Sequence, residues 1–187
     1  MPLPVSVQAY NGTQMYISDS GSNRIQEVAR TSHTEWNISM KANDIYTIAG
    51  SATGTAGFSG DGGLATSALL DNPGQVALDG SLNMYIPDTN NNREREVSSS
   101  NYKISEVAGD GQTLASMGDG GPAVDGELFR PAGQAEDAAG NIYISDGGNN
   151  PAPHWTRMGW HLASPAAWRR RLTVCSCARI YRVHAHI

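Results

Sequence analysis

The sequence predicts an all-β protein built from four-stranded antiparallel units of the kind that form the blades of a β-propeller. A tyrosine-centred segment occurs three times, at residues 16–19, 85–88 and 143–146, with spacings of 69 and 58 residues. A proline stands twelve residues before each of these tyrosines. Self-similarity at such periods is typical of propellers and other repeat architectures. The 21 glycines and only two phenylalanines in 187 residues indicate many turns and short elements.

A second motif has the same period. Gly-Asp-Gly-Gly at residues 60–63 returns at residues 118–121, again 58 residues later. Residues 60–92 align with residues 118–150 without a gap, and 15 of the 33 positions are identical. This degree of identity indicates a duplicated structural unit.

The second unit shows the expected order of four strands, named A to D. Residues 75–78 are a short apolar run, and Asp79-Gly80-Ser81 has turn chemistry. Met84-Tyr85-Ile86 is the centre of strand B, since β-branched and aromatic residues favour strands. Residues 93–97 and 103–108 are strands C and D. Strands packed between neighbouring blades are buried on both faces, which explains why strand B is continuously apolar.

Composition limits the function classes. The first 150 residues contain all 18 Asp and Glu but only seven of the 13 Lys and Arg, so this body is acidic and a nucleic-acid partner is not expected. Both cysteines, Cys175 and Cys177, lie after residue 150. No apolar run approaches ~20 residues, so no transmembrane helix is expected. The first residues also show no signal-peptide pattern.

The repeated phrases resemble the NHL repeat. The phrase Tyr-Ile-Ser-Asp-x-Gly-x-Asn-Arg-Ile-x-x-Val covers residues 16–28, and Ile-Tyr-Thr-Ile-Ala-Gly covers residues 45–50. Gly-Phe-Ser-Gly-Asp-Gly-Gly at 57–63 and Pro-x-x-Val-Ala-x-Asp at 73–79 complete the set. The resemblance covers residues 4–150. Three departures stand out: Tyr10 replaces the aspartate that Asp79 and Asp137 supply, Glu94 stands where Ile25 is apolar, and an insert spans residues 31–43.

The resemblance implies part of a six-bladed propeller, as in secreted bacterial proteins, receptor-kinase sensor domains and some amidating lyases. We expect an NHL-like propeller fragment over residues 1–150, with units of about 1–50, 51–109 and 110–150, forming an incomplete ring. An extracellular or cell-envelope location follows from the resemblance alone. Open blade edges predict poor solubility or self-association.

The candidate binding residues lie on one face of this layout. The B–C turns and the D-to-A connections meet on the same side, here named the B–C face, because successive strands run in opposite directions. Aspartates end each strand B, two more lie in the Gly-Asp-Gly-Gly loops, and arginines follow the B–C turns. The candidates are Asp19, Asp61, Asp88, Asp119, Asp146, Arg24 and Arg93.

The same aspartates have a structural interpretation, which the residue pattern favours. Each could end its strand by accepting backbone N–H bonds and pair with Arg24 or Arg93 across the tight turn. The Gly-Asp-Gly-Gly loop lacks the Lys-Ser/Thr of a phosphate-binding loop and the oxygens of a calcium loop. No metal, cofactor or catalytic residue is expected. His33 in the insert is expected to be solvated, and Trp36 to fold back over the C–D hairpin.

Residues 151–187 depart from the family pattern. They contain six arginines, no acidic residue, three of the four tryptophans and four of the five histidines. Cys175-x-Cys177 with His184 and His186 imitates a metal cluster, but the spacing is not the usual zinc spacing. We expect an irregular non-family tail, produced by a frameshift or disordered.

Two functions remain open from the sequence. The first is a non-enzymatic binding scaffold for a protein or polysaccharide, which the acidic, loop-rich body favours. The second is a fragment of a propeller enzyme, of lyase or lactonase type, whose metal site lies in other blades.

Overall fold

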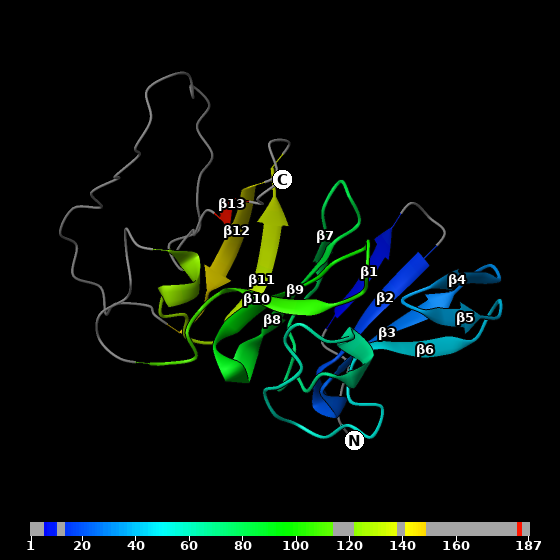
Figure 1. The fold of residues 1–187 in the computed structure, drawn as a ribbon, viewed down its shortest axis with the longest axis horizontal. Helices are drawn as coiled ribbons and strands as arrows, with labels where there is room; N and C mark the ends of the chain where they lie inside the picture. Colours follow the sequence, from blue (N-terminus) through cyan, green and yellow to red (C-terminus); the bar gives the residue numbers. More distant parts are fainter. Residues whose placement is uncertain (1–5, 11–13, 114–121, 138–140, 149–182, 185–187) are drawn as a thin grey trace.

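The chain folds into antiparallel sheets that stand side by side (Figure 1). The computed structural model describes residues 6–10, 14–113, 122–137, 141–148 and 183–184. These residues contain β-strands and short 3-10 turns but no α-helix. The fold is all-β, and its four-stranded sheets are β-propeller blades.

Two sheets have the predicted A-to-D strand order. Blade 1 contains β1 (Ser6–Tyr10), β2 (Gln14–Asp19), β3 (Arg24–Ala29) and β6 (Ile45–Gly50) in that order across the sheet. Blade 2 contains β7 (Ala77–Leu78), β8 (Met84–Asp88), β9 (Arg93–Val97) and β10 (Ile104–Ala108). Every neighbouring pair within them is antiparallel.

The third sheet begins with β11 (Pro131–Glu136) and β12 (Asn141–Asp146), the strands A and B of blade 3. Its third strand is β13 (Val183–His184), which pairs with Asn141 and Ile142. These two residues are the described part of the segment expected to be an irregular tail. The rest of residues 151–187 lies outside the described ranges, as does Asp119.

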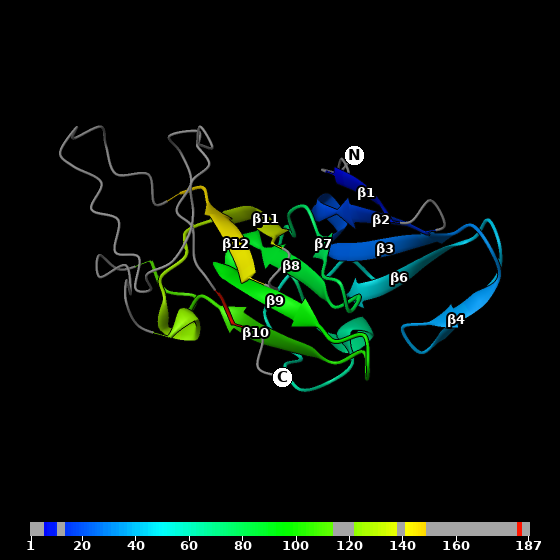
Figure 2. The same ribbon diagram turned by 90° about the horizontal axis from the view of Figure 1, so that it is seen from above.

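The main core lies between blades 1 and 2, which Figure 2 shows next to each other. Tyr16 and Ile25 of blade 1 face Met84 and Ile86 of blade 2, and all four are at most 1% exposed. Tyr85 points the other way, into a second cluster with blade 3. Strand β8 is buried along its whole length. Burial on both faces is not uniform in the other strands B, because Met15 and Ile17 of β2 and Tyr143 of β12 are only half-buried.

The insert at residues 31–43 forms an outer hairpin of β4 (His33–Glu35) and β5 (Ile38–Met40). Its turn residues Trp36 and Asn37 both have positive φ, 54° and 60°, as a two-residue turn of type I′ requires. Trp36 is 2% exposed and packs between the rings of Tyr16 and Tyr102. The prediction that Trp36 folds back over the C–D hairpin is confirmed.

The long connection between blades 1 and 2 fills the space between their outer strands. It contains the turn η2 (Ala65–Ser67), and Ala65, Ala68 and Leu70 are at most 2% exposed in the main core. Gly62 donates its N–H to the Ile104 carbonyl, and Ile104 donates to Gly63. The connection therefore covers the outer edge of β10, an edge that would otherwise expose unpaired backbone groups.

Within the described residues, no helix is long and apolar enough to span a bilayer.

Candidate functional site

The B–C turns are built in the same way in both complete blades. Each is a single 3-10 turn, η1 (Ser20–Ser22) in blade 1 and η3 (Thr89–Asn91) in blade 2. Each ends in an asparagine in the left-handed conformation, Asn23 with φ 54° and Asn92 with φ 55°. Asparagine tolerates this conformation better than most residues. The turns therefore bring Arg24 and Arg93 to equivalent positions at the start of strand C.

These asparagines also fasten each blade to the next. Oδ1 of Asn23 accepts a hydrogen bond of 2.9 Å from the Asn72 amide, and Oδ1 of Asn92 accepts one of 2.9 Å from the Arg130 amide. The hydroxyl groups of Ser20 and Thr89 donate to the carbonyls of Pro73 and Pro131. The B–C face is thus held by a repeated set of inter-blade hydrogen bonds.

Asp88 is fully buried at the end of strand B. Its Oδ1 accepts the Asp71 amide at 2.8 Å, and its Oδ2 accepts Nδ2 of Asn91 at 2.8 Å and Nη1 of Arg95 at 3.2 Å. Burial raises the pKa of Asp88 to about 6, while these hydrogen bonds and the Arg95 charge act in the opposite direction. Asp146 repeats the backbone bond, because its Oδ1 accepts the Phe129 amide at 2.8 Å.

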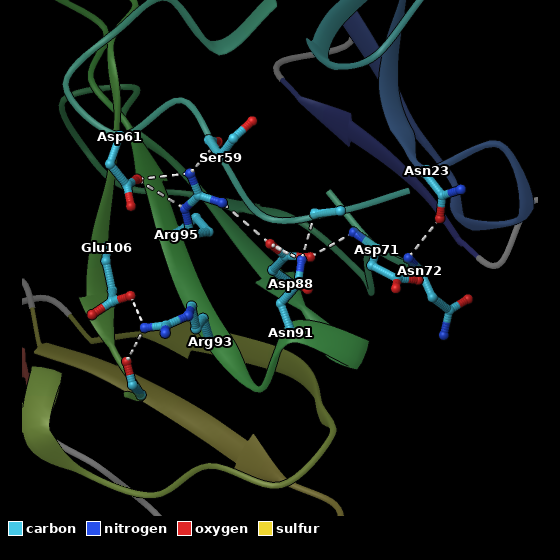
Figure 3. Close-up of polar contacts among 12 residues, drawn as sticks. Asn23, Ser59, Asp61, Asp71, Asn72, Asp88, Asn91, Arg93, Arg95 and Glu106 are labelled. Carbon is cyan, nitrogen blue, oxygen red and sulfur yellow. Dashed lines mark hydrogen bonds and ion pairs between the residues drawn. The ribbon is translucent and has the colours of Figure 1, made fainter. Parts of the chain in front are cut away.

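Arg95 joins two of the predicted acids (Figure 3). Its guanidinium is 0% exposed, contacts Asp88, and lies 2.7 Å from Oδ1 of Asp61. The same group donates to the Ser59 carbonyl at 3.2 Å. Asp61 keeps 37% of its side chain exposed. The Gly-Asp-Gly-Gly loop at residues 60–63, in the connection between blades 1 and 2, is therefore anchored to strand C of blade 2.

Arg93 does not pair with Asp88. It binds Glu106 (Figure 3). It also donates to the carbonyls of Gly109 and Asp110, at 3.2 Å and 2.7 Å. Its guanidinium carbon also lies 4.2 Å from the ring centre of Phe58, and that of Arg95 lies at 4.8 Å. The expected pairing across the turn occurs only in blade 1, where Nε of Arg24 lies 2.9 Å from Asp19.

A shallow depression of about 280 Å³ opens on the B–C face of blade 1. Nη1 of Arg24 approaches the Ala52 carbonyl at 3.5 Å, and Asn23 donates to the Gly54 carbonyl at 2.9 Å. These bonds hold backbone and hydroxyl groups at the surface. The depression is lined by Gly21, Ser22, Arg24, Ala52, Thr53 and Gly54.

The candidate residues thus form separate groups. Asp61 and Asp88 meet through Arg95, Asp19 pairs with Arg24 beside the depression, and Arg93 belongs to a third contact set. Asp146 lies in blade 3. Ligand binding by these residues stays a prediction, and their contacts show that each described one also has a structural partner.

The sequence did not show that the ionisable side chains of Glu27, Glu94 and Arg95 are fully buried. Arg95 aligns with Gln26 of blade 1, so the repeat did not single it out. Glu94 was noted as a departure from Ile25, and the structure shows it 0% exposed, with no hydrogen-bond partner for either carboxyl oxygen among the described residues. Burial, reinforced by the nearby Asp88 charge, raises the pKa of Glu94 well above its ordinary value.

The chain is similar to several solved structures from Bacteroides. An auxiliary nutrient binding protein from Bacteroides ovatus matches with a TM-score of 0.57 and 19% identity, over 75% of this chain and 34% of that one. A protein of the same description from Bacteroides thetaiotaomicron matches with a TM-score of 0.56 and 18% identity, over 75% of this chain and 34% of that one. A protein of unknown function from Bacteroides thetaiotaomicron matches with a TM-score of 0.56 and 22% identity, over 71% of this chain and 30% of that one.

These similarities support the propeller-like fold but no particular family or function, because the sequence identities are low. The chain spans about a third of the length of the structures that it matches. No protein-family model and no curated protein matches the sequence.

Proposed function

We propose that the chain is part of an NHL-type β-propeller that acts as a non-enzymatic binding scaffold and takes a neutral polysaccharide on its B–C face, outside the cytoplasm. The observation that carries the proposal is the depression of about 280 Å³ on blade 1. Its lining offers the Arg24 guanidinium, the Ser22 and Thr53 hydroxyls and backbone groups. Such convergent polar groups suit a ligand rich in hydroxyls.

The charge of the chain favours a neutral ligand over a polyanion. The acidic residues outnumber the basic ones strongly in residues 1–150, and Asp61 and Asp19 lie on the same face as Arg24. Repulsion from this field would oppose an acidic polymer. Two of the solved structures with a similar fold are described as auxiliary nutrient binding proteins, which is consistent with a binding role.

In this proposal some of the seven predicted residues contact the ligand, and others support the turns and loops around it. Arg24 and Asp61, which remain partly exposed, would contact the ligand. Asp19, Asp88 and Arg93 would hold the turns and loops in place, and Asp146 would do the same in blade 3. Asp119 lies outside the described residues and has no assigned part in the proposal.

Affinity electrophoresis tests the proposal. The full chain is run through gels that contain xylan, dextran or starch, and retardation is compared with a plain gel. We expect one polysaccharide to retard the wild type, and Arg24→Ala and Thr53→Ala to reduce retardation at least fivefold. Ser100→Ala, an exposed change in the C–D turn at the other end of β9, is the matched control and should behave as wild type.

Two results would contradict the proposal. One is a wild-type chain that no polysaccharide retards, and the other is retardation that survives both depression variants. Loss of retardation in Ser100→Ala alone would move the site to the opposite face.

A further inference from the structure

Three metal-ligating side chains meet on the outer part of blade 1, away from the B–C turns. They are Glu27 of β3 and His33 and Glu35 of β4, and one ligand atom from each lies within 4.8 Å of the others. His33 and Glu35 are two residues apart on one strand, so their side chains point to the same side. The hairpin turn at Trp36 and Asn37 folds this strand back toward β3 and Glu27.

The contact between Glu27 and His33 joins two buried polar atoms. Nδ1 of His33 donates to the Thr31 carbonyl at 2.8 Å, which leaves Nε2 facing Glu27. The Thr31 bond and the charges of Glu27 and Glu35 raise the pKa of His33, which favours a proton on Nε2 when no metal is bound. Nε2 lies 3.0 Å from Oε1 of Glu27, without hydrogen-bond geometry. Both atoms are buried, and neither has a hydrogen-bond partner among the described residues. A cation between these two atoms, either the Nε2 proton of an imidazolium or a metal ion in its place, stabilises them at this distance.

The outer hydrogen bonds orient the three groups. Nε1 of Trp36 donates to Oε2 of Glu27 at 2.8 Å, and Nε2 of Gln14 donates to Oε2 of Glu35 at 2.6 Å. Oε2 of Glu35 lies 3.6 Å from Nε2 of His33. Protein metal sites commonly use such bonds, in particular a His that donates its second nitrogen to a backbone carbonyl. Here the Thr31 carbonyl has that position.

The cluster also has one open side. The Glu27 side chain is 0% exposed, whereas His33 and Glu35 keep 22% and 18% of their side chains exposed. Three protein ligands with an open position leave room for a water molecule as the fourth ligand of a tetrahedral ion.

We propose that Glu27, His33 and Glu35 bind one divalent transition-metal ion, with zinc as the best match. One imidazole nitrogen and two carboxylate oxygens form a ligand set typical of Zn²⁺, at ~2.0–2.2 Å from each ligand. The ion joins the β4–β5 hairpin to β3 and so holds Trp36 over the outer core. The expectation that His33 is merely solvated is wrong, because its side chain is 22% exposed and contacts Glu27 and the Thr31 carbonyl.

Zinc binding to the full chain tests the proposal. The protein is treated with a chelator and desalted, and zinc is titrated against a chromophoric competitor, with elemental analysis for stoichiometry. Cys175→Ser/Cys177→Ser separates the cluster from any zinc bound by the tail thiols. His33→Ala and Glu35→Gln remove ligands, and Asp44→Asn is the matched control, an exposed acid just after the same hairpin.

We expect one zinc equivalent that the cysteine variant retains, an affinity at least 100-fold lower in His33→Ala, and an affinity at least tenfold lower in Glu35→Gln. Asp44→Asn should equal wild type. Cobalt should give visible bands without thiolate charge transfer, and zinc should raise the melting temperature of wild type but not of His33→Ala. Circular dichroism of the two metal-free proteins checks that the variant folds.

Three results would overturn the proposal. They are the absence of bound zinc in the cysteine variant, an unchanged affinity in both ligand variants, and an imidazolium signal for His33 that persists when zinc is in excess.

Discussion

The buried ion pair between Arg95 and Asp88 supports a quantitative prediction. Both side chains are 0% exposed, and Arg95 lies 3.2 Å from Asp88 and 2.7 Å from Asp61. Arg95→Met keeps much of the side-chain volume but removes the charge, so Asp88 loses its buried cation. Removal of one partner of a buried pair costs about 3–5 kcal/mol, because the remaining charge stays desolvated.

The matched control is Arg24→Met. Arg24 pairs with Asp19 at 2.9 Å in the equivalent turn, but the two side chains are 26% and 14% exposed. Pairs that solvent reaches contribute about 0.2–1 kcal/mol. The two variants therefore differ in burial, while the substitution and the position next to the B–C turn are similar.

Thermal and urea unfolding followed by circular dichroism measure the difference. For a protein of this size, 1 kcal/mol shifts the melting temperature by about 2–4 °C, so Arg95→Met should melt roughly 6–20 °C below wild type. Arg24→Met should melt within about 4 °C of wild type. Equal shifts in the two variants would refute the reasoning that burial, and not pairing alone, sets the magnitude.

The loss of stability caused by Arg95→Met should depend on pH. The folded-state pKa of Asp88 is raised to about 6 from an ordinary value of 3.8. Because this pKa is higher in the folded protein, the contribution of Asp88 to the free energy of unfolding is greatest at low pH. It decreases as the pH rises from about 4 toward the folded pKa. Without Arg95 the pKa rises further, so the loss of stability in the variant should be larger at pH 8 than at pH 5. A loss that is independent of pH would show that Asp88 is not the group left uncompensated.

Other contacts give further expected outcomes. Glu94→Leu should raise the free energy of unfolding by about 1–3 kcal/mol at pH 8, because it removes a buried carboxyl that lacks a hydrogen-bond partner. The raised pKa of Glu94 makes the stability of the wild type fall as the pH rises above 4.5. Urea unfolding should therefore show that the stability gained by Glu94→Leu is smaller at low pH than at pH 8. A larger gain at low pH would contradict this explanation. Asn92→Gly should lose about 0.5–1.5 kcal/mol with its bond to Arg130. Asn92→Ala should lose about 1–2 kcal/mol more, since alanine is strained at φ 55°. Equal melting temperatures for the two Asn92 variants would mean that the left-handed backbone is not retained.

The strands and turns within each blade could be predicted because they depend on residues that are close together in the sequence. Strands B and C of blades 1 and 2 lie where β-branched and aromatic residues and the Asn-Arg turns predicted them. The short β7 was harder to locate, since only Ala77 and Leu78 form a strand in the run expected at 75–78. The acids at the ends of strand B were found because the repeat aligns them.

The contacts of those acids could not be predicted, since they join residues far apart in the sequence. Asp61 reaches Arg95 across 34 residues, and although the Gly-Asp-Gly-Gly motif marks Asp61, no local pattern marks Arg95 as its partner. The cluster around His33 was missed for the same reason. Its membership depends on a hairpin that folds back onto β3, and the pattern of residues 31–43 alone does not show that Glu27 lies beneath it.

Hydrogen–deuterium exchange with a bound neutral polysaccharide tests ligand binding on the B–C face. The polysaccharide that retards the full chain is added in excess, and amide protection is compared with the free protein. We expect new protection in residues 20–24 and 51–63, around the depression and the Asp61 loop. Protection confined to the C–D turn at residues 98–103, or no change anywhere, would contradict it.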